Sequence, residues 1–289
     1  MLPPSLQSYI EQELGSKIIS TQSVSGGSIN QAAKIEVKNV GHCFLKWNTS
    51  TNPDMFNKEA KGLKLLSSAE TNLIIPEVII KGKTVDNIGF LLLEFLPEER
   101  RTANAPRSFG ENLARLHKHT AEKFGLDHDN YIGRLHQSNT RHKSWSDFFI
   151  EERIMPQLKM GADSGYFSSQ DRQAFQNLFR QIPDIFPGEP PSLLHGDLWS
   201  GNYFYTDSGK AAIFDPAVYY GSREIELSFT RLFGGFSAGF YEAYDQSHPL
   251  EAGFDNRIDI YNLYPLLVHT NLFGSSYASQ VKSIVKKFR

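Results

Sequence analysis

Short alternating and apolar segments dominate the first 96 residues of the chain. Residues 42–47 alternate between a side that carries Lys46 and a side that carries Leu45 and Trp47, which is the period of a β-strand. Residues 74–80 are also apolar, but Pro76 interrupts them and favours a position near a sheet edge. The pattern predicts helices at 5–14 and 56–66, and strands at 18–24, 32–37, 42–47, 74–80 and 89–93.

From residue 107 onward, apolar residues recur every three or four positions, as in α-helices. Pro97 and the charged run 98–101 precede this region and indicate a boundary. We therefore predict an α+β fold of two lobes: a small N-terminal antiparallel β lobe at 1–96 and a larger, mainly helical lobe at 97–289. Within the second lobe the pattern predicts helices at 145–155, 170–182, 222–232, 236–244 and 258–288, and one strand at 211–214.

The composition is that of an ordinary globular protein, with 40% hydrophobic and 21% charged residues. The formal net charge of −2 gives no overall attraction to nucleic acid or to an anionic membrane. Cys43 is the single cysteine, which excludes an internal disulfide and a thiolate metal cage and favours a reducing compartment. With no signal-peptide pattern at the start and no long apolar run, we expect a cytoplasmic protein without nucleic-acid or membrane partners.

The segment LLHGDLWSGN at 193–202 carries the strongest chemical signal. Asn202 follows Asp197 by five positions and Asp215 follows Asn202 by thirteen, an order typical of a phosphoryl-transfer catalytic loop. Asp197 is then the base that accepts the proton of an attacking hydroxyl, and Asn202 and Asp215 are the ligands of Mg²⁺. His195 is expected to orient the loop through backbone hydrogen bonds. The alternative is a structural loop in which these Asp and Asn side chains cap turns.

Lys46, near the end of the third predicted strand, is a candidate for contact with nucleotide phosphates. Glu59 on the following helix is its candidate ion-pair partner. Taken alone, Lys46 is equally consistent with an edge-strand charge that prevents aggregation, and Glu59 with a solvated helix residue. Their occurrence together with the Asp, Asn and Asp series favours the ion pair.

Two further segments are expected to contact ATP. Gly26, Gly27 and Ser28 lie between two predicted strands, where backbone N–H groups at a hairpin tip can bind an anion. A plain hairpin turn explains the same residues without a ligand. Glu94, Phe95 and Leu96 end the last strand of the first lobe, and their backbone is expected to meet the adenine edge at a hinge.

Taken together, these motifs resemble the fructosamine kinase family, a branch of the aminoglycoside-phosphotransferase-like kinases with a protein-kinase-like fold. The resemblance covers most of the chain, and HGDLWSGN and DPAVYYG are its most specific segments. It is carried by residues 26–30, 44–46, 56, 59–60, 62–63, 92–94, 113–117, 195–202, 215–221 and 223–224.

The resemblance implies an ATP- and Mg²⁺-dependent kinase that phosphorylates the 3-hydroxyl of ketosamines, the adducts of sugars on amines, and so leads to deglycation. The partner is then a ketosamine, free or protein-bound, and the protein a monomer or weak dimer. Trp199 is the candidate residue for acceptor binding, since an indole can stack on a sugar; a core aromatic under the loop is the alternative. Ser222 and Glu226 depart from the family pattern and bear on the acceptor preference.

Two other functions fit part of the pattern. A kinase of the same fold acting on an aminoglycoside, a choline-like molecule or a simple sugar hydroxyl shares the catalytic residues but not the family-specific segments. A nucleotide-binding pseudokinase would be expected to lack one of Lys46, Asp197 and Asn202, all of which are present.

Overall fold

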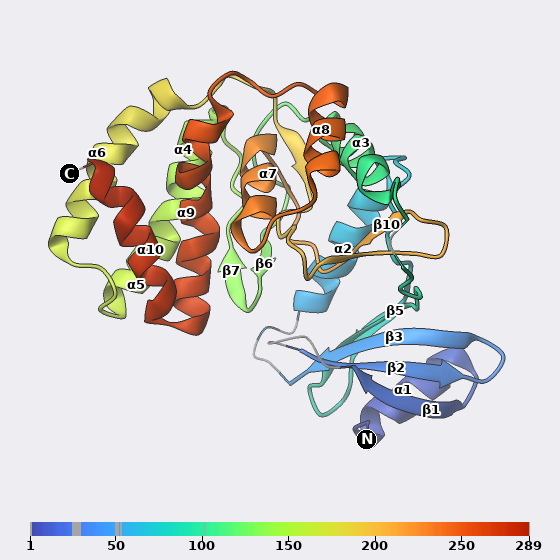
Figure 1. Ribbon diagram of the computed structural model, residues 1–289. Coiled ribbons are helices and arrows are strands. Elements are labelled where there is room, and N and C mark those ends of the chain that lie inside the picture. The colour runs from blue at the N-terminus through green and yellow to red at the C-terminus, as the bar shows by residue number, and fades with distance from the viewer. Residues whose placement is uncertain (1, 25–29, 50–51, 53, 101, 289) are drawn as a thin grey trace.

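The computed structural model describes residues 2–24, 30–49, 52, 54–100 and 102–288. They form two lobes (Figure 1), an antiparallel five-stranded sheet with two helices and a larger mainly helical lobe, so the predicted fold class is confirmed. The elements of the first lobe are α1 (Pro4–Leu14), β1 (Ile18–Val24), β2 (Gln31–Val37), β3 (Gly41–Asn48), α2 (Met55–Ser67), β4 (Val78–Lys83) and β5 (Gly89–Glu94).

The sheet has the strand order β1-β2-β3-β5-β4, which places β5 between β3 and β4. Side chains alternate between the two faces of a strand, and both faces of β5 are covered by a helix. Phe90 and Leu92 belong to the apolar cluster that includes α1, whereas Leu91 and Leu93 pack with Phe56 of α2. This double burial explains why residues 90–93 of β5 are apolar without interruption.

The first helix of the second lobe is α3 (Ala105–His117). We propose the boundary between the lobes at residues 96 and 97, because β5 has ended and α3 has not begun there. The other elements of the second lobe are β6 (Asn130–Ile132), β7 (Leu135–Gln137), α4 (Trp145–Phe148), the π-helix η1 (Phe149–Ile154), α5 (Met155–Asp163), α6 (Ser169–Ile185), β8 (Ser192–Leu194), β9 (Tyr203–Tyr205), β10 (Ala211–Ile213), β11 (Tyr219–Gly221), α7 (Arg223–Leu232), α8 (Ala238–Ser247), α9 (Phe254–Phe273), α10 (Ser275–Val285) and the 3₁₀ turn η2 (Lys286–Phe288).

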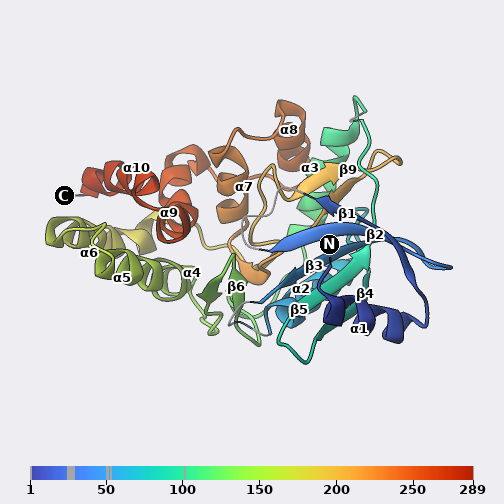
Figure 2. The ribbon, with the colours of Figure 1, turned by 90° about the horizontal axis from the view of Figure 1, so that it is seen from below.

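Helices α5, α6 and α10 lie at the end of the molecule remote from the N-terminal sheet (Figure 2). Among the described residues, no helix combines the length and the apolar character that crossing a bilayer requires.

Three expectations from the sequence need correction. The strand predicted at 74–80 starts only at Val78, because Ile74 instead pairs with Ala212 of β10 in the other lobe. The helix predicted at 145–155 passes through the π-helix η1 before α5 begins. The helix predicted at 258–288 is divided at Gly274, whose φ of 101° is incompatible with a helix.

Helices α3 and α8 pack so closely that one position between them has no room for a side chain. A Cβ atom on Gly110 of α3 would lie 2.1 Å from the carbonyl oxygen of Phe240 in α8. Phe109, next to Gly110, is buried against Phe240 and Tyr205, so this contact connects α3 to the hairpin β9–β10. The pair of helices α3 and α8 therefore supports the hairpin of β9 and β10.

Gly110→Ala is expected to lower the free energy of unfolding by about 1–3 kcal/mol, because the helices must separate to admit the methyl group. In an ordinary helix the same change is stabilising by roughly 1 kcal/mol, so the sign distinguishes the two situations. Urea unfolding measures the effect. Gly188→Ala is the control, since a Cβ there meets nothing within 4 Å. An unchanged or raised midpoint for Gly110→Ala would contradict the packing described.

Candidate active site

The loop 195–202 is held between two short strand pairs. Strand β8 leads into it and pairs with β11, and β9 follows it and pairs with β10. Gly196 in this loop has φ +84°, and a Cβ there would lie 2.1 Å from the carbonyl oxygen of Ala217. Only glycine fits this close approach of two backbones, which explains the Gly of the HGD motif.

His195 joins the loop to the segment that carries Asp215. Its Nε2 lies 2.9 Å from the carbonyl oxygen of Phe214, and its Nδ1 lies 3.3 Å from the backbone N of Asp197. A neutral imidazole satisfies both contacts, with Nε2–H donating to the carbonyl and Nδ1 accepting from the backbone N–H. Burial lowers the pKa of His195 and favours this neutral form. His195 thus makes the backbone contacts that the sequence suggested.

Asp197 and Asn202 lie side by side in the loop. The Nδ2 of Asn202 donates to the carbonyl oxygen of Asp197 over 2.8 Å and to its Oδ2 over 3.1 Å. The amide oxygen Oδ1 of Asn202 therefore points away from Asp197. Burial raises the pKa of the Asp197 carboxyl well above its usual range, and the negative charge of Asp215 is the second largest cause of this rise.

Lys46 of β3 is shared by two carboxylates. Its Nζ lies 2.9 and 3.1 Å from the two carboxylate oxygens of Glu59 in α2, and 2.5 Å from Oδ1 of Asp215. Lys46 is only 5% exposed. Burial by itself would lower the Lys46 pKa, but the charges of Asp215 and Glu59 outweigh it and raise that pKa. Asp215 has φ +57°, so its backbone takes a left-handed conformation that is rare outside glycine.

The remaining predicted nucleotide contacts are placed in part. Gly26, Gly27 and Ser28 lie outside the described residues. Glu94 closes β5, where its backbone N donates to the carbonyl oxygen of Glu77 over 2.9 Å. Phe95 and Leu96 follow in the segment that leaves the sheet.

Trp199 lies on the surface of the loop, with 37% of its area exposed, and so is not a core aromatic. Its ring covers Gly201, where a Cβ would approach the indole to 2.3 Å, and it contacts the ring of Phe233 edge-on at 6.5 Å. The loop therefore presents an indole to solvent two residues after Asp197.

Glu226 of α7 has a role that the sequence analysis missed. This buried carboxylate accepts hydrogen bonds from the backbone N of His195 over 3.2 Å and of Gly196 over 2.7 Å, and from His117 Nε2 over 2.9 Å. The Nδ1 of His117 in turn lies 2.7 Å from the hydroxyl of Tyr244. Burial alone would raise the Glu226 pKa, but the hydrogen bond and charge of His117 outweigh it and lower that pKa. Sequence spacing gave no signal for this network, whose hydrogen-bonded members lie 30 to 127 positions apart.

Asp197 is one of the residues that line a small cavity of about 20 Å³. It is bounded by residues from both sides of the catalytic loop and from α7 and α9, and a largely apolar wall surrounds the carboxylates of Asp197 and Glu226. The other lining residues are Ile132, Leu194, Gly196, Tyr219, Ile225, Phe229, Tyr264, Pro265, Val268 and His269.

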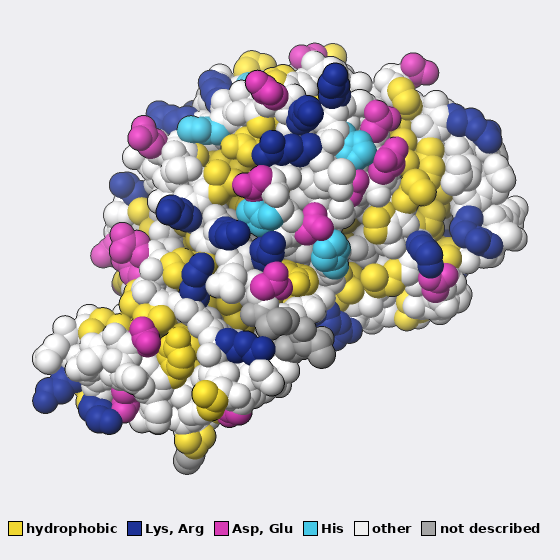
Figure 3. All heavy atoms as spheres, turned by 180° about the vertical axis from the view of Figure 1, so that it is seen from behind, with side chains coloured by type: hydrophobic (Ala, Val, Ile, Leu, Met, Phe, Trp, Pro, Cys, Tyr) yellow, Lys and Arg dark blue, Asp and Glu magenta, His cyan; other side chains and the backbone are white. Residues whose placement is uncertain are grey.

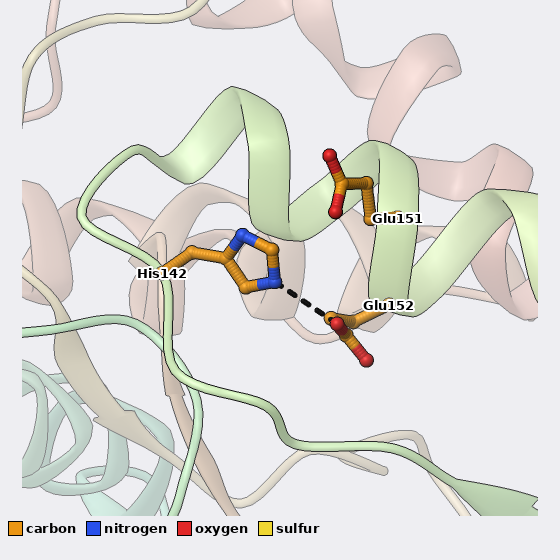
Figure 4. A group of neighbouring side chains, drawn as sticks. All are labelled: His142, Glu151 and Glu152. Carbon is orange, nitrogen blue, oxygen red and sulfur yellow. Dashed lines mark hydrogen bonds and ion pairs between the residues drawn. The ribbon is translucent and has the colours of Figure 1, made fainter.

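Elsewhere in the described residues, His142, Glu151 and Glu152 form a group with the composition of a metal site (Figure 4). Their candidate ligand atoms lie within 4.8 Å of one another. His142 Nε2 already contacts Glu152 Oε1 at 2.9 Å, and this contact accounts for the arrangement without an ion. It fastens the segment after β7 to the π-helix η1.

Comparison with known proteins places these features in one family. The fructosamine kinase family model matches residues 3–289. A probable ketoamine kinase of Enterococcus faecium is 36% identical over 278 residues, which are 96% of this chain and 96% of the relative. The chloroplastic protein-ribulosamine 3-kinase of Arabidopsis thaliana is 36% identical over 276 residues, which are 94% of this chain and 83% of the relative.

A solved structure agrees with these sequence matches. The crystal structure of a putative fructosamine-3-kinase from Haemophilus somnus superposes with a TM-score of 0.87 at 30% identity, covering 98% of this chain and 96% of the other. The match over almost the whole chain, in sequence and in structure, means that this protein belongs to the fructosamine kinase family.

Proposed function

We propose that this protein is an ATP- and Mg²⁺-dependent kinase that phosphorylates the 3-hydroxyl of ketosamines and so initiates their removal from amines. The observation that carries the proposal is the convergence of Lys46, Asp197 and Asp215, which come from two lobes, on one site. The names of the relatives, ketoamine kinase and protein-ribulosamine 3-kinase, support the acceptor class.

Each residue of the site has a part in this reaction. Lys46, held by Glu59, would contact the nucleotide phosphates. The amide oxygen of Asn202 and the carboxylate of Asp215 form an oxygen donor set of the kind that Mg²⁺ prefers, and these two residues would hold the ion. Bound Mg²⁺ supplies charge neutralisation on the transferred phosphate.

Asp197 would accept the proton of the acceptor hydroxyl. Its hydrogen bond from Asn202 fixes one carboxylate oxygen and leaves the other for the acceptor. The nearby charge of Asp215 contributes to the raised pKa of Asp197, and a cation bound by Asp215 offsets that charge. The carboxylate form needed for a base is therefore favoured when the metal is present.

The proposed product explains the repair function. A ketosamine carries its carbonyl at C2, so a phosphate on O3 becomes a leaving group once the adduct tautomerises to its enamine. Phosphate leaves far more readily than hydroxide, and its loss from C3 leaves an imine of a 3-deoxy dicarbonyl sugar. Water hydrolyses this imine without a further enzyme, which releases the free amine and the dicarbonyl sugar. Positioning and electrostatic stabilisation of phosphoryl transfer are all that the protein has to provide.

We further propose a cytoplasmic protein that is a monomer or weak dimer and does not bind nucleic acid. In support, Cys43 is a buried free thiol. The face in Figure 3 bears basic and acidic side chains interspersed with one another.

The first test follows the product. Ribated or glycated lysine with Mg·ATP is expected to give a transient ³¹P signal of a sugar phosphate, then inorganic phosphate and unmodified lysine. Asp197→Asn keeps the shape of the base but removes its proton affinity, so kcat should fall by roughly 10²- to 10⁴-fold. Turnover that leaves a stable phosphate on another hydroxyl would refute the repair function. Comparing hexose-, pentose- and tetrose-derived ketosamines with aminoglycosides tests the acceptor class.

The second test concerns the metal. Asp215→Ala removes a charged ligand and should abolish activity and weaken binding of Mg·ATP, measured by calorimetry with and without Mg²⁺. Asn202→Ala should weaken Mg·ATP binding less, because a neutral ligand is lost. Equal Mg·ATP affinity in Asp215→Ala and the parent would exclude Asp215 as a metal ligand.

The third test concerns Glu226 as a positioning residue. Glu226→Gln places an amide NH₂ against groups that all donate to the carboxylate, so at least one contact is lost. We expect the free energy of unfolding to fall by about 1–3 kcal/mol. We also expect kcat to fall on the order of 100-fold, with the affinity for Mg·ATP unchanged. Glu242→Gln, an exposed carboxylate on α8, is the control. A parent-like kcat would show that the loop does not depend on Glu226.

A further inference from the structure

Aromatic side chains from the loop 195–202 and from three helices gather at the surface beside Asp197. We call the set Trp199, Phe233, His269 and Tyr277 the aromatic wall. The ring centroids of Phe233 and His269 are 4.7 Å apart, and those of His269 and Tyr277 are 5.1 Å apart. Trp199 joins the set through Phe233. The loop, the end of α7, α9 and α10 thus contribute to one continuous aromatic surface.

The aromatic wall adjoins the predicted base. Trp199 follows Asp197 by two residues, and His269 lines the same cavity as Asp197. Phe229 also lines that cavity and contacts the His269 ring at 6.3 Å. A molecule whose hydroxyl reaches Asp197 therefore has aromatic rings beside it.

The electrostatics of this region favour a cation. Among the described residues, the cavity lining contains the carboxylates of Asp197 and Glu226 and no Lys or Arg, and the guanidinium of Arg153 lies outside the lining, 3.9 Å from the ring centroid of Tyr219. His269 Nδ1 lies 2.7 Å from the carbonyl oxygen of Pro265, to which a neutral imidazole donates its N–H. Burial lowers the pKa of His269, so the ring carries no charge that would repel a cation at neutral pH.

A ketosamine differs from a free ketose in having such a cation. Its nitrogen is bonded to C1, two carbons from C3, and a secondary amine at that position is protonated in neutral water. We infer that the aromatic wall binds this substituted ammonium through cation–π contacts, next to the negative charge of Asp197, and thereby selects ketosamines over neutral sugars. This inference rests on the proposed function and adds the basis of its selectivity.

Stacking of the sugar itself on Trp199 is the competing explanation. Stacking uses the C–H groups of the sugar and is the same whether the atom on C1 is nitrogen or oxygen. A cation–π site prefers the nitrogen compound to the oxygen compound, because only the nitrogen carries a positive charge.

The test compares two acceptors that differ in one atom, 1-deoxy-1-(butylamino)ribulose and 1-O-butylribulose. Both are assayed for kcat/KM with Mg·ATP and for affinity by calorimetry. We expect the parent to prefer the amine, and the ratio of amine to ether to fall roughly tenfold in Trp199→Leu and in Phe233→Leu, a size between those of an exposed and a desolvated cation–π contact. His269→Lys should lower the ratio further, because it adds a repelling charge. Phe179→Leu on α6 is the control and should keep the parent ratio.

The outcomes separate the inference from the proposed function. If both acceptors are phosphorylated and the variants reduce kcat/KM equally for both, the wall serves stacking only and the inference is overturned. If the amine binds with the expected preference but is not phosphorylated, the ammonium site is supported and the kinase proposal fails. If neither acceptor binds, both are refuted.

Discussion

The shared charge of Lys46 is the interaction on which the site depends. One buried ammonium contacts Glu59 in the first lobe and Asp215 in the second, so it connects the sheet, α2 and the segment after β10. Removing one partner from a buried ion pair typically costs about 3–5 kcal/mol, because the other charge remains buried. The same three groups are therefore a structural link between lobes and the proposed cradle for the nucleotide.

The second lobe supplies an equally rigid support for the catalytic loop. Glu226 binds two successive backbone N–H groups before Asp197, and His195 binds the carbonyl before Asp215. Both carboxylates proposed for the reaction, Asp197 and Asp215, are thus positioned through the backbone next to them, in addition to the contacts that Asn202 and Lys46 make with their side chains. Phosphoryl transfer benefits from such positioning, because its catalysis is mostly orientation and charge stabilisation.

The two sides of Asp197 differ in character. Toward Asp215 the site holds a buried ammonium, which suits phosphate. Toward His269 it holds carboxylates and aromatic rings, which suit a cation with an apolar body. The phosphates of the donor are anionic and the proposed acceptor is cationic. The charges on the two sides of Asp197 therefore favour the donor on one side of the base and the acceptor on the other.

The sequence by itself determined the two-lobed fold class and gave Lys46, Glu59, Asp197, Asn202 and Asp215 as candidate site residues, because local periodicity and short motif spacing encode them. It did not locate the break at Gly274 or the pairing of Ile74 with Ala212, which depend on backbone angles and on the docking of the lobes. The Glu226 network and the aromatic wall were decided only by the tertiary structure. Their members are distant in the chain, and only packing brings them into contact.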